Sequence, residues 1–278
     1  MQTNTGQFDL AVVERLPALP AVLLDLMRAL EKEGASAVEL AGKIGRDIPL
    51  SLRVLKVVNS PFYGLPRQIG SLAEAVMVLG AGTVKSLVTA ALFMNRLPLK
   101  ASGGFNPQLT WEHGLVCALC ARRLAPQAGL DGDVAFTCGL LHDIGQIVLY
   151  TQVPGSFEAV STLRRDRGLS LVAAEKEIFG VDHADVGGRV VARWHLPAAI
   201  EAAVASHHAP EGGDRLGDLL QVADVLCRFI ELEDLGIPEP VEASAAFVRL
   251  GFTRGECLQL LAPIRGEFAA ARALLDPG

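Results

Sequence analysis

Residues 134–150 read Val-Ala-Phe-Thr-Cys-Gly-Leu-Leu-His-Asp-Ile-Gly-Gln-Ile-Val-Leu-Tyr, and the rest of the chain can be understood from them. The stretch is apolar except for His142, Asp143 and Gln146. An imidazole beside a carboxylate is costly to bury unless both groups find partners. A metal ion or a hydrogen-bond network is the usual partner. We therefore expect a buried helix that carries part of a polar site.

The composition favours packed helices. The chain has 278 residues, half of them apolar and few of them aromatic. The apolar residues are mostly Leu, Ala and Val, which suit helices better than sheets. No segment of useful length alternates polar and apolar residues as a half-buried strand does. We predict an all-α protein, built as a two-lobed helical bundle.

Charge and cysteine content narrow the class of protein. The net charge of −6 does not suggest general nucleic-acid binding. The five cysteines lie within apolar patterns, so we expect a reduced, cytoplasmic protein. Cys117 and Cys120 are interpreted as small core residues, because no second pair follows at zinc-site spacing. No apolar run approaches the length needed to span a bilayer, so no membrane is expected.

Glycine and proline divide the chain into units. Pro98, Gly103, Gly104 and Pro107 mark residues 98–108 as a linker. We predict, in order, an N-terminal helical lobe, the linker, a second helical lobe, and C-terminal helices that pack on the second lobe. Their predicted bounds are residues 1–97, 98–108, 109–235 and 236–278.

Local signals place individual helices. Residues 1–15 look like a loose leader, and apolar residues from Leu19 to Leu30 repeat at helical spacing. Asp133 is expected to cap a helix that bears His142 and Asp143. The other expected caps are Ser36, Ser71, Asp182 and Thr253. Asn59 is predicted to hold the turn at Pro61 through backbone hydrogen bonds, with a partner contact as the alternative.

Five of the six histidines, with two aspartates, are predicted to form one constellation. Its members are His113, His142, Asp143, His183, His207, His208 and Asp224. Imidazole and carboxylate ligands suit Zn, Fe, Mn or Ni. Seven ligands exceed one site and fit two metals, with Asp143 as the bridge because a carboxylate has two oxygens. The alternative is a set of satisfied polar groups at helix ends, since no local motif such as H-E-x-x-H is present. His195 is interpreted as a helix-end residue.

These motifs resemble a known family. The order His113, His142-Asp143 and Asp224 is similar to the HD superfamily of metal-dependent phosphohydrolases. Further motifs resemble an HDOD domain over roughly residues 14–235: Arg46-Asp47-Ile48-Pro49-Leu50, Asn59-Ser60, Leu79-Gly80, Gly139-Leu-Leu-His-Asp-Ile-Gly145, Phe179-Gly180-Val-Asp-His183, Trp194-His-Leu-Pro197 and His207-His208-Ala-Pro210. Ile48 departs from the pattern, because the family usually has Pro directly after the Asp. The resemblance implies an all-α fold with an HD-like second lobe.

The seven residues of the constellation also resemble the ligand set of the HD-GYP branch, which hydrolyses cyclic di-GMP. This resemblance implies that all seven are metal ligands. Three departures are evident: Gln146 stands where that branch has a phosphate-binding Lys, Leu109 where some members place an extra Glu ligand, and no Gly-Tyr-Pro follows His208. Four arginines could take the place of this Lys in binding phosphate: Arg122, Arg123, Arg189 and Arg193. At helical spacing, such residues are more often solvated charges.

Two functions are compatible with the sequence. The resemblance implies a bacterial regulatory HDOD protein that acts through contacts with signalling proteins, with or without metal at the retained site. The alternative is a metal-dependent phosphohydrolase or phosphodiesterase acting on a nucleotide or another phosphodiester. Asp143 would then be catalytic, with one or two ions of Fe, Mn, Ni or Zn as cofactor. The regulatory interpretation is the one that the sequence favours.

Overall fold

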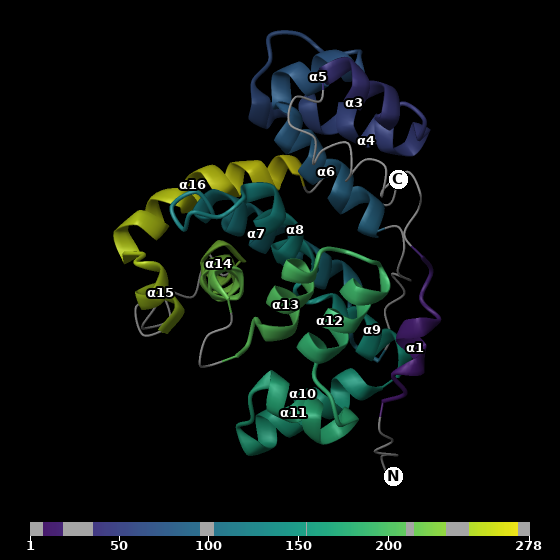
Figure 1. The fold of residues 1–278 in the computed structure, drawn as a ribbon, viewed down its shortest axis with the longest axis vertical. Coiled ribbons are helices and arrows are strands. Elements are labelled where there is room, and N and C mark those ends of the chain that lie inside the picture. Colours follow the sequence, from purple (N-terminus) through teal and green to yellow (C-terminus); the bar gives the residue numbers. More distant parts are fainter. Residues whose placement is uncertain are drawn as a thin grey trace.

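The structure, a computed structural model, describes residues 8–18, 36–94, 103–153, 155–209, 214–231 and 245–271. Every regular element within these ranges is a helix, and no strand is formed there (Figure 1). The predicted all-α fold is confirmed. The predicted helix from Leu19 to Leu30 lies outside the described residues, as do residues 98–102 of the predicted linker.

In the described part of the front lobe there are four α-helices. They are α3 (Ala37–Ile44), α4 (Ile48–Val58), α5 (Leu72–Leu79) and α6 (Ala81–Met94). Ser36 caps α3 and Ser71 caps α5, as predicted, each by accepting a hydrogen bond from a backbone N–H three residues on. Asp47 caps α4 in the same way, which lets Pro49 stand in the first turn where its missing N–H costs nothing.

Asn59 joins α4 to the segment that leads into α5. Its side-chain oxygen accepts from the backbone N–H of Ile69 at 2.7 Å. Its amide nitrogen lies 2.9 Å from the carbonyl oxygens of both Leu55 and Ile69. The predicted backbone hydrogen bonds are present, but they fasten the chain at Ile69 rather than at the turn of Pro61.

Eight helices build the second lobe. They are α7 (Pro107–Leu124), α8 (Gly132–Leu141), α9 (Ile144–Gln152), α10 (Ser156–Arg167), α11 (Leu171–Phe179), α12 (His183–Arg193), α13 (Ala198–Ser206) and α14 (Arg215–Glu231). Asp182 caps α12, as predicted, and forms a capping box with Asp185. Because α7 already begins at Pro107, the last two residues of the predicted linker are helical.

The prediction of a single helix that bears both His142 and Asp143 was wrong in two respects. Asp131, not Asp133, caps α8, with its side chain accepting from the backbone N–H groups of Asp133 and Val134 at 2.8 and 2.9 Å. The helix also ends at Leu141, and a new one starts at Ile144. His142 and Asp143 therefore occupy the junction between α8 and α9, where side chains can leave the helical repeat and turn inward.

By length and composition alone, the helical stretch 132–152 is long and apolar enough to cross a membrane. The sequence had led us to expect no apolar stretch of that length. Of the most apolar window within residues 132–152, 78% is buried inside the protein. The interruption at His142 and Asp143 lies in this stretch. Burial on this scale is that of a core helix in a bundle.

The segment that looked like a loose leader is in part packed against the second lobe. Phe8 is buried edge-on against Phe179, and its N–H donates to the carbonyl of Phe179 at 2.9 Å. The short helix α1 (Ala11–Glu14) contacts α12. The indole of Trp194 donates to the carbonyl of Pro17 at 3.0 Å. These contacts correct the expectation for residues 8–15, whereas residues 1–7 lie outside the described ranges.

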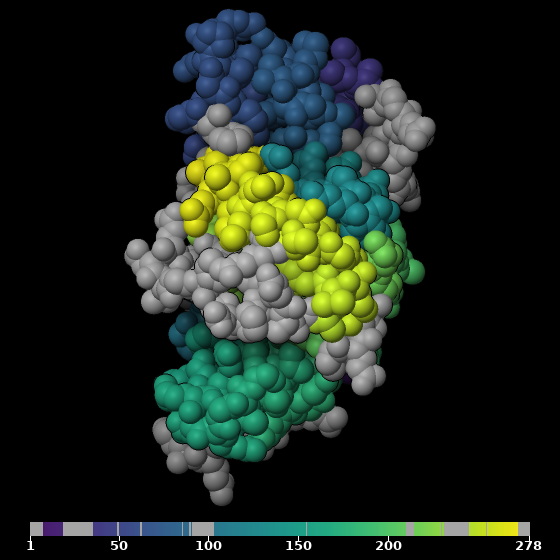
Figure 2. Space-filling model, turned by 90° about the vertical axis from the view of Figure 1, so that its left-hand side faces the viewer, coloured from purple at the N-terminus to yellow at the C-terminus, as the bar shows by residue number. Residues whose placement is uncertain are grey.

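Within the described residues 245–271 lie the helices α15 (Ala245–Leu250) and α16 (Arg254–Ala271). Thr253 and Glu256 cap α16 reciprocally, as predicted. Helix α16 contacts α7 and α14 of the second lobe. It also contacts the 3-10 turn η1 (Pro61–Tyr63) of the front lobe, so it lies across the junction of the two lobes (Figure 2).

Candidate metal centre

The carboxylate of Asp143 lies at the centre of the predicted constellation. Its Oδ2 is 3.3 Å from Nε2 of His142 and 3.8 Å from Nε2 of His113. Its Oδ1 is 3.3 Å from Nε2 of His183 and 3.6 Å from Nε2 of His207. Each oxygen thus faces a different pair of imidazoles.

All seven predicted residues come together, in two groups. One group is His113, His142 and Asp224, in which Nε2 of His113 is 3.0 Å from Oδ1 of Asp224. The other group consists of Asp143 with three histidines, namely His183, His207 and His208. Within each group, the atoms that would bind a metal lie within 4.8 Å of one another. Asp143 belongs with the second group and also faces the first.

Glycines allow the helices to approach closely enough for this convergence. A Cβ on Gly139 would lie 2.6 Å from the backbone of Ala118, so α8 and α7 pack backbone to backbone. A Cβ on Gly145 would lie 1.9 Å from the carbonyl oxygen of His183, at the start of α12. Contacts this short exclude any side chain. The glycines bring His142 and Asp143 next to ligands on α7 and α12.

Three histidines are oriented so that Nε2 faces the centre. The Nδ1 atoms of His142 and His207 lie 2.7 Å from the carbonyl oxygens of Gly139 and Val204, to which they donate. The Nδ1 of His183 donates to Oε2 of Glu175 at 2.5 Å. Such contacts fix the tautomer and leave the Nε2 lone pair for a metal. The Gly139 carbonyl thus supports His142 on the side of the ring away from the centre.

Buried polar atoms without a hydrogen-bond partner point to the same conclusion. Within the described part of the chain, Nε2 of His142, Nε2 of His207 and Oδ1 of Asp143 are buried and make no hydrogen bond. Native proteins rarely leave such atoms unsatisfied, and a bound ion is one of the standard explanations. The donor set of imidazole nitrogens and carboxylate oxygens fits first-row divalent metals. The residues therefore fit a metal.

Electrostatics hold the cluster together as a charged network. Burial opposes the charged form of Asp143, but His142 outweighs it and keeps the pKa of Asp143 well below its usual range. Burial also opposes charging of His183, yet hydrogen bonds with Asp143 and Glu175 raise its pKa to about 10. Burial, together with His207 and His183, lowers the pKa of His208 to about 3. The Nε2 atoms of His183 and His208 lie 2.9 Å apart.

Glu175 is a functional residue that sequence reasoning missed. It is fully buried on α11, and besides His183 Nδ1 it accepts from the backbone N–H of His183 at 2.9 Å and from the Tyr150 hydroxyl at 2.7 Å. In the sequence it stands beside Lys176 and Glu177, which makes it look like part of a solvated face. In the sequence, burial of Glu175 is indicated only by its position between apolar residues of the preceding turn and Phe179.

We expect Glu175→Gln to weaken metal binding about 10- to 100-fold, because it removes the charge that supports His183. Competition with a chromophoric chelator would measure the change. Glu177→Gln is the matched control, since Glu177 is exposed on the same helix and pairs with Arg167. Equal metal affinity in the Glu175→Gln protein and the wild type would show that Glu175 does not act through His183.

The other titratable residues weighed from the sequence belong to neither ligand group. His195 is exposed at the end of α12 with a φ of 55°, in keeping with a helix-end residue. Cys117 and Cys120 are buried free thiols of the core. Three of the candidate arginines are engaged away from the centre, namely Arg122 with Asp133, Arg123 with Glu267 and Arg193 with Glu14.

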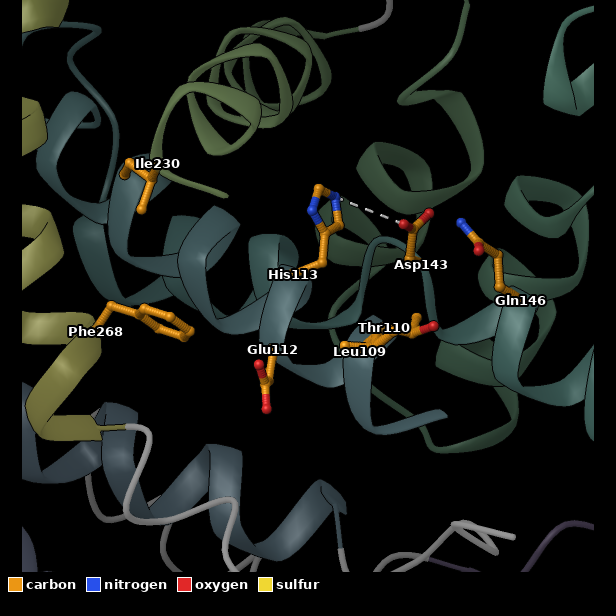
Figure 3. A pocket seen from close by; sticks show the side chains of 8 residues that line it. All are labelled: Leu109, Thr110, Glu112, His113, Asp143, Gln146, Ile230 and Phe268. Carbon is orange, nitrogen blue, oxygen red and sulfur yellow. Dashed lines mark ion pairs between the residues drawn. The ribbon is translucent and has the colours of Figure 1, made fainter. Parts of the chain in front are cut away.

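A pocket of about 580 Å³ reaches two of the candidate ligands, His113 and Asp143 (Figure 3). Its lining consists of Leu109, Thr110, Glu112, His113, Asp143, Gln146, Ile230 and Phe268. This volume is typical of a small-molecule site. His113 and Asp143 present their polar atoms at one end of the pocket, so a ligand there would reach the metal centre.

Comparison with curated proteins shows distant relatives longer than this chain. An uncharacterized protein of Treponema pallidum (strain Nichols) is 26% identical over 242 residues, which is 84% of this chain and 47% of the relative. Ribonuclease Y of Thermus thermophilus is 28% identical over 208 residues, 74% of this chain and 30% of the relative. The chain thus spans less than half the length of these relatives.

Solved structures show the same fold over nearly the whole chain. A protein of Shewanella amazonensis SB2B that is assigned as a phosphohydrolase has a TM-score of 0.77 and 25% identity, covering 95% of this chain and 97% of its own. An HDOD domain protein of unknown function from Geobacter sulfurreducens has a TM-score of 0.74 and 24% identity, covering 96% and 94%. The HDOD domain family itself matches residues 16–210, well over half of the sequence. The chain belongs to the HDOD domain family.

Proposed function

We propose that this HDOD protein is a metal-dependent phosphohydrolase with two metal ions. The observation that carries the proposal is Asp143, whose two oxygens face two separate groups of ligands. His113, His142 and Asp224 would hold one ion, and His183, His207 and His208 the other, with Asp143 shared. The buried, unpartnered Nε2 atoms of His142 and His207 support this arrangement.

When bound, a pair of metals activates water and neutralises charge on a phosphoryl group. The protein's own residues supply orientation and access. Gly139, Val204 and Glu175 fix the ring orientation of three histidines through Nδ1. Thr110 and Gln146 line the pocket beside Asp143 and offer neutral hydrogen-bonding groups to a phosphate ester.

The relatives support a phosphoester substrate. Ribonuclease Y is named for cleaving RNA, whose backbone is a phosphodiester, and the Shewanella protein is named for phosphate-ester hydrolysis. Because the chain covers only part of the curated relatives, their substrates are carried over here only as part of the proposal.

The five cysteines of this chain are free and buried, which fits the reducing environment of the cytoplasm.

A second candidate function is regulation through contact with signalling proteins. The observation that favours it is the front lobe, where large apolar side chains are exposed. These are Val38, Ile48, Leu52 and Met77, each more than 60% exposed. Apolar surface that is contiguous and exposed marks sites that bind other proteins, and these four side chains would contribute to such a surface. The two functions are compatible, because hydrolysis would take place in the other lobe.

Metal analysis and a substrate screen test the proposal. Protein purified without chelator is expected to hold two divalent ions per chain, and to hydrolyse a phosphodiester when supplied with Mn, Fe or Ni. The screen would contain cyclic dinucleotides and bis(p-nitrophenyl) phosphate. Absence of hydrolysis by metal-replete protein would reject the enzymatic function and favour the regulatory one. Absence of bound metal after reconstitution would reject the metal centre itself.

A further inference from the structure

The end of the pocket away from the metal centre is apolar. Ile230 of α14 and Phe268 of α16 form its wall, and Figure 3 shows the Phe268 ring directed toward the cavity. Ile230 is buried and Phe268 is half-buried, so both have one face against the core. The pocket therefore has a polar end at Asp143 and an apolar end that includes an aromatic ring.

The position of Phe268 is fixed by its neighbours. Glu267, the preceding residue, forms an ion pair with Arg123 of α7. Helix α16 packs along α7, the helix that carries His113. Phe268 therefore lies on a helix that these contacts hold in place, and not on a loop. This favours a single orientation of its ring.

The charges of the lining restrict which ligands fit. Among the described residues that line the pocket there is no lysine or arginine, and Glu112 and Asp143 are acidic. A polyanion such as a nucleoside triphosphate would meet repulsion along the wall. A ligand with a single phosphate group at the metal end and an uncharged remainder avoids this repulsion.

We infer that Phe268 and Ile230 form a subsite for the base of a nucleotide that carries one phosphate ester. This inference rests on the proposed function, since the phosphate is assigned to the metal end. A planar base can stack on an aromatic side chain, and Phe268 offers one at the end of the pocket away from Asp143. Both subsite residues lie outside the 16–210 match, so the subsite belongs to the C-terminal part of this chain.

Binding of two phosphonates to the metal-loaded, full-length protein tests the subsite. One probe is the non-hydrolysable phosphonate analogue of adenosine 5′-monophosphate, and the other is methylphosphonate, which has no base. Calorimetry is expected to give a Kd at least about tenfold lower for the nucleotide analogue, the size expected for one stacked base. Phe268→Ala should raise the Kd of the nucleotide analogue about tenfold and leave that of methylphosphonate unchanged.

Two further variants separate stacking from folding. Phe268→Leu keeps apolar bulk but no planar face, so it should also lose the preference for the nucleotide analogue. Leu258→Ala removes a partly exposed apolar side chain from the same helix and should change neither Kd. Equal affinity of the wild type for both probes, or an unchanged preference in Phe268→Ala, would overturn the subsite while leaving the metal centre intact. If neither probe binds, both the subsite and the phosphate site are rejected.

Discussion

Asp143→Asn is expected to abolish metal binding and, with it, any phosphoester hydrolysis. Of the two oxygens that face the two ligand groups, the amide would retain one. The other would become an NH₂ group directed at imidazole nitrogens, and the negative charge would be lost. Loss of an outer hydrogen-bond partner weakens metal affinity about 10- to 100-fold, so loss of the shared ligand should exceed about 100-fold.

Metal content and thermal melting should be measured together for this variant. Asp166→Asn makes the same chemical change at an exposed site on α10 and should leave both quantities unchanged. A folded Asp143→Asn protein that still binds two ions would mean that Asp143 is not shared between them. A hydrolysis rate equal to that of the wild type would remove Asp143 from the catalytic machinery.

Gly145→Ala is expected to destabilise the protein by about 3 kcal/mol or more, at the upper end for overpacking. The added Cβ would lie 1.9 Å from the carbonyl oxygen of His183 and 2.8 Å from the backbone nitrogen of Gly187. Both are backbone atoms, so no side-chain rotation can relieve the contact. Helix α9 must move away from α12, which separates Asp143 from His183. Melting temperature and metal affinity should therefore fall together.

Gly42→Ala is the matched control for this substitution. Gly42 is also a helical glycine, but an added Cβ there would have no atom within 4 Å. Alanine is the better helix former by up to about 1 kcal/mol, so the melting temperature should rise slightly. A melting temperature for Gly145→Ala equal to that of Gly42→Ala would show that α9 and α12 are not held at the described separation.

Much of the fold could be predicted from local sequence, and the reasons are visible at particular residues. Ser36, Ser71 and Asp182 cap helices because each places a short polar side chain next to free N–H groups, an effect confined to one turn. The break at His142 and Asp143 could not be predicted in this way. Apolar residues flank it on both sides, and the closeness of Gly145 to α12 is a tertiary contact.

In the candidate site, too, some residues could be predicted from local sequence and others depend on tertiary contacts. Its histidines could be selected because the chain has only six of them, and four of the five in the site lie at helix boundaries, namely after α8, at the start of α12 and after α13. Glu175 could not, because its role depends on burial beneath His183 and Tyr150. Phe268 could not either, since nothing in the last helix indicates that it faces a pocket lined by residues more than a hundred positions earlier.

Helix α16 couples the position of the front lobe to the shape of the pocket. It supplies Phe268 to the pocket and contacts η1 of the front lobe. Near that contact, Tyr63, Glu267 and Ala271 line a cavity of about 90 Å³ at the lobe junction. A rotation of the front lobe must therefore either carry α16 along, and with it the pocket wall, or break this contact.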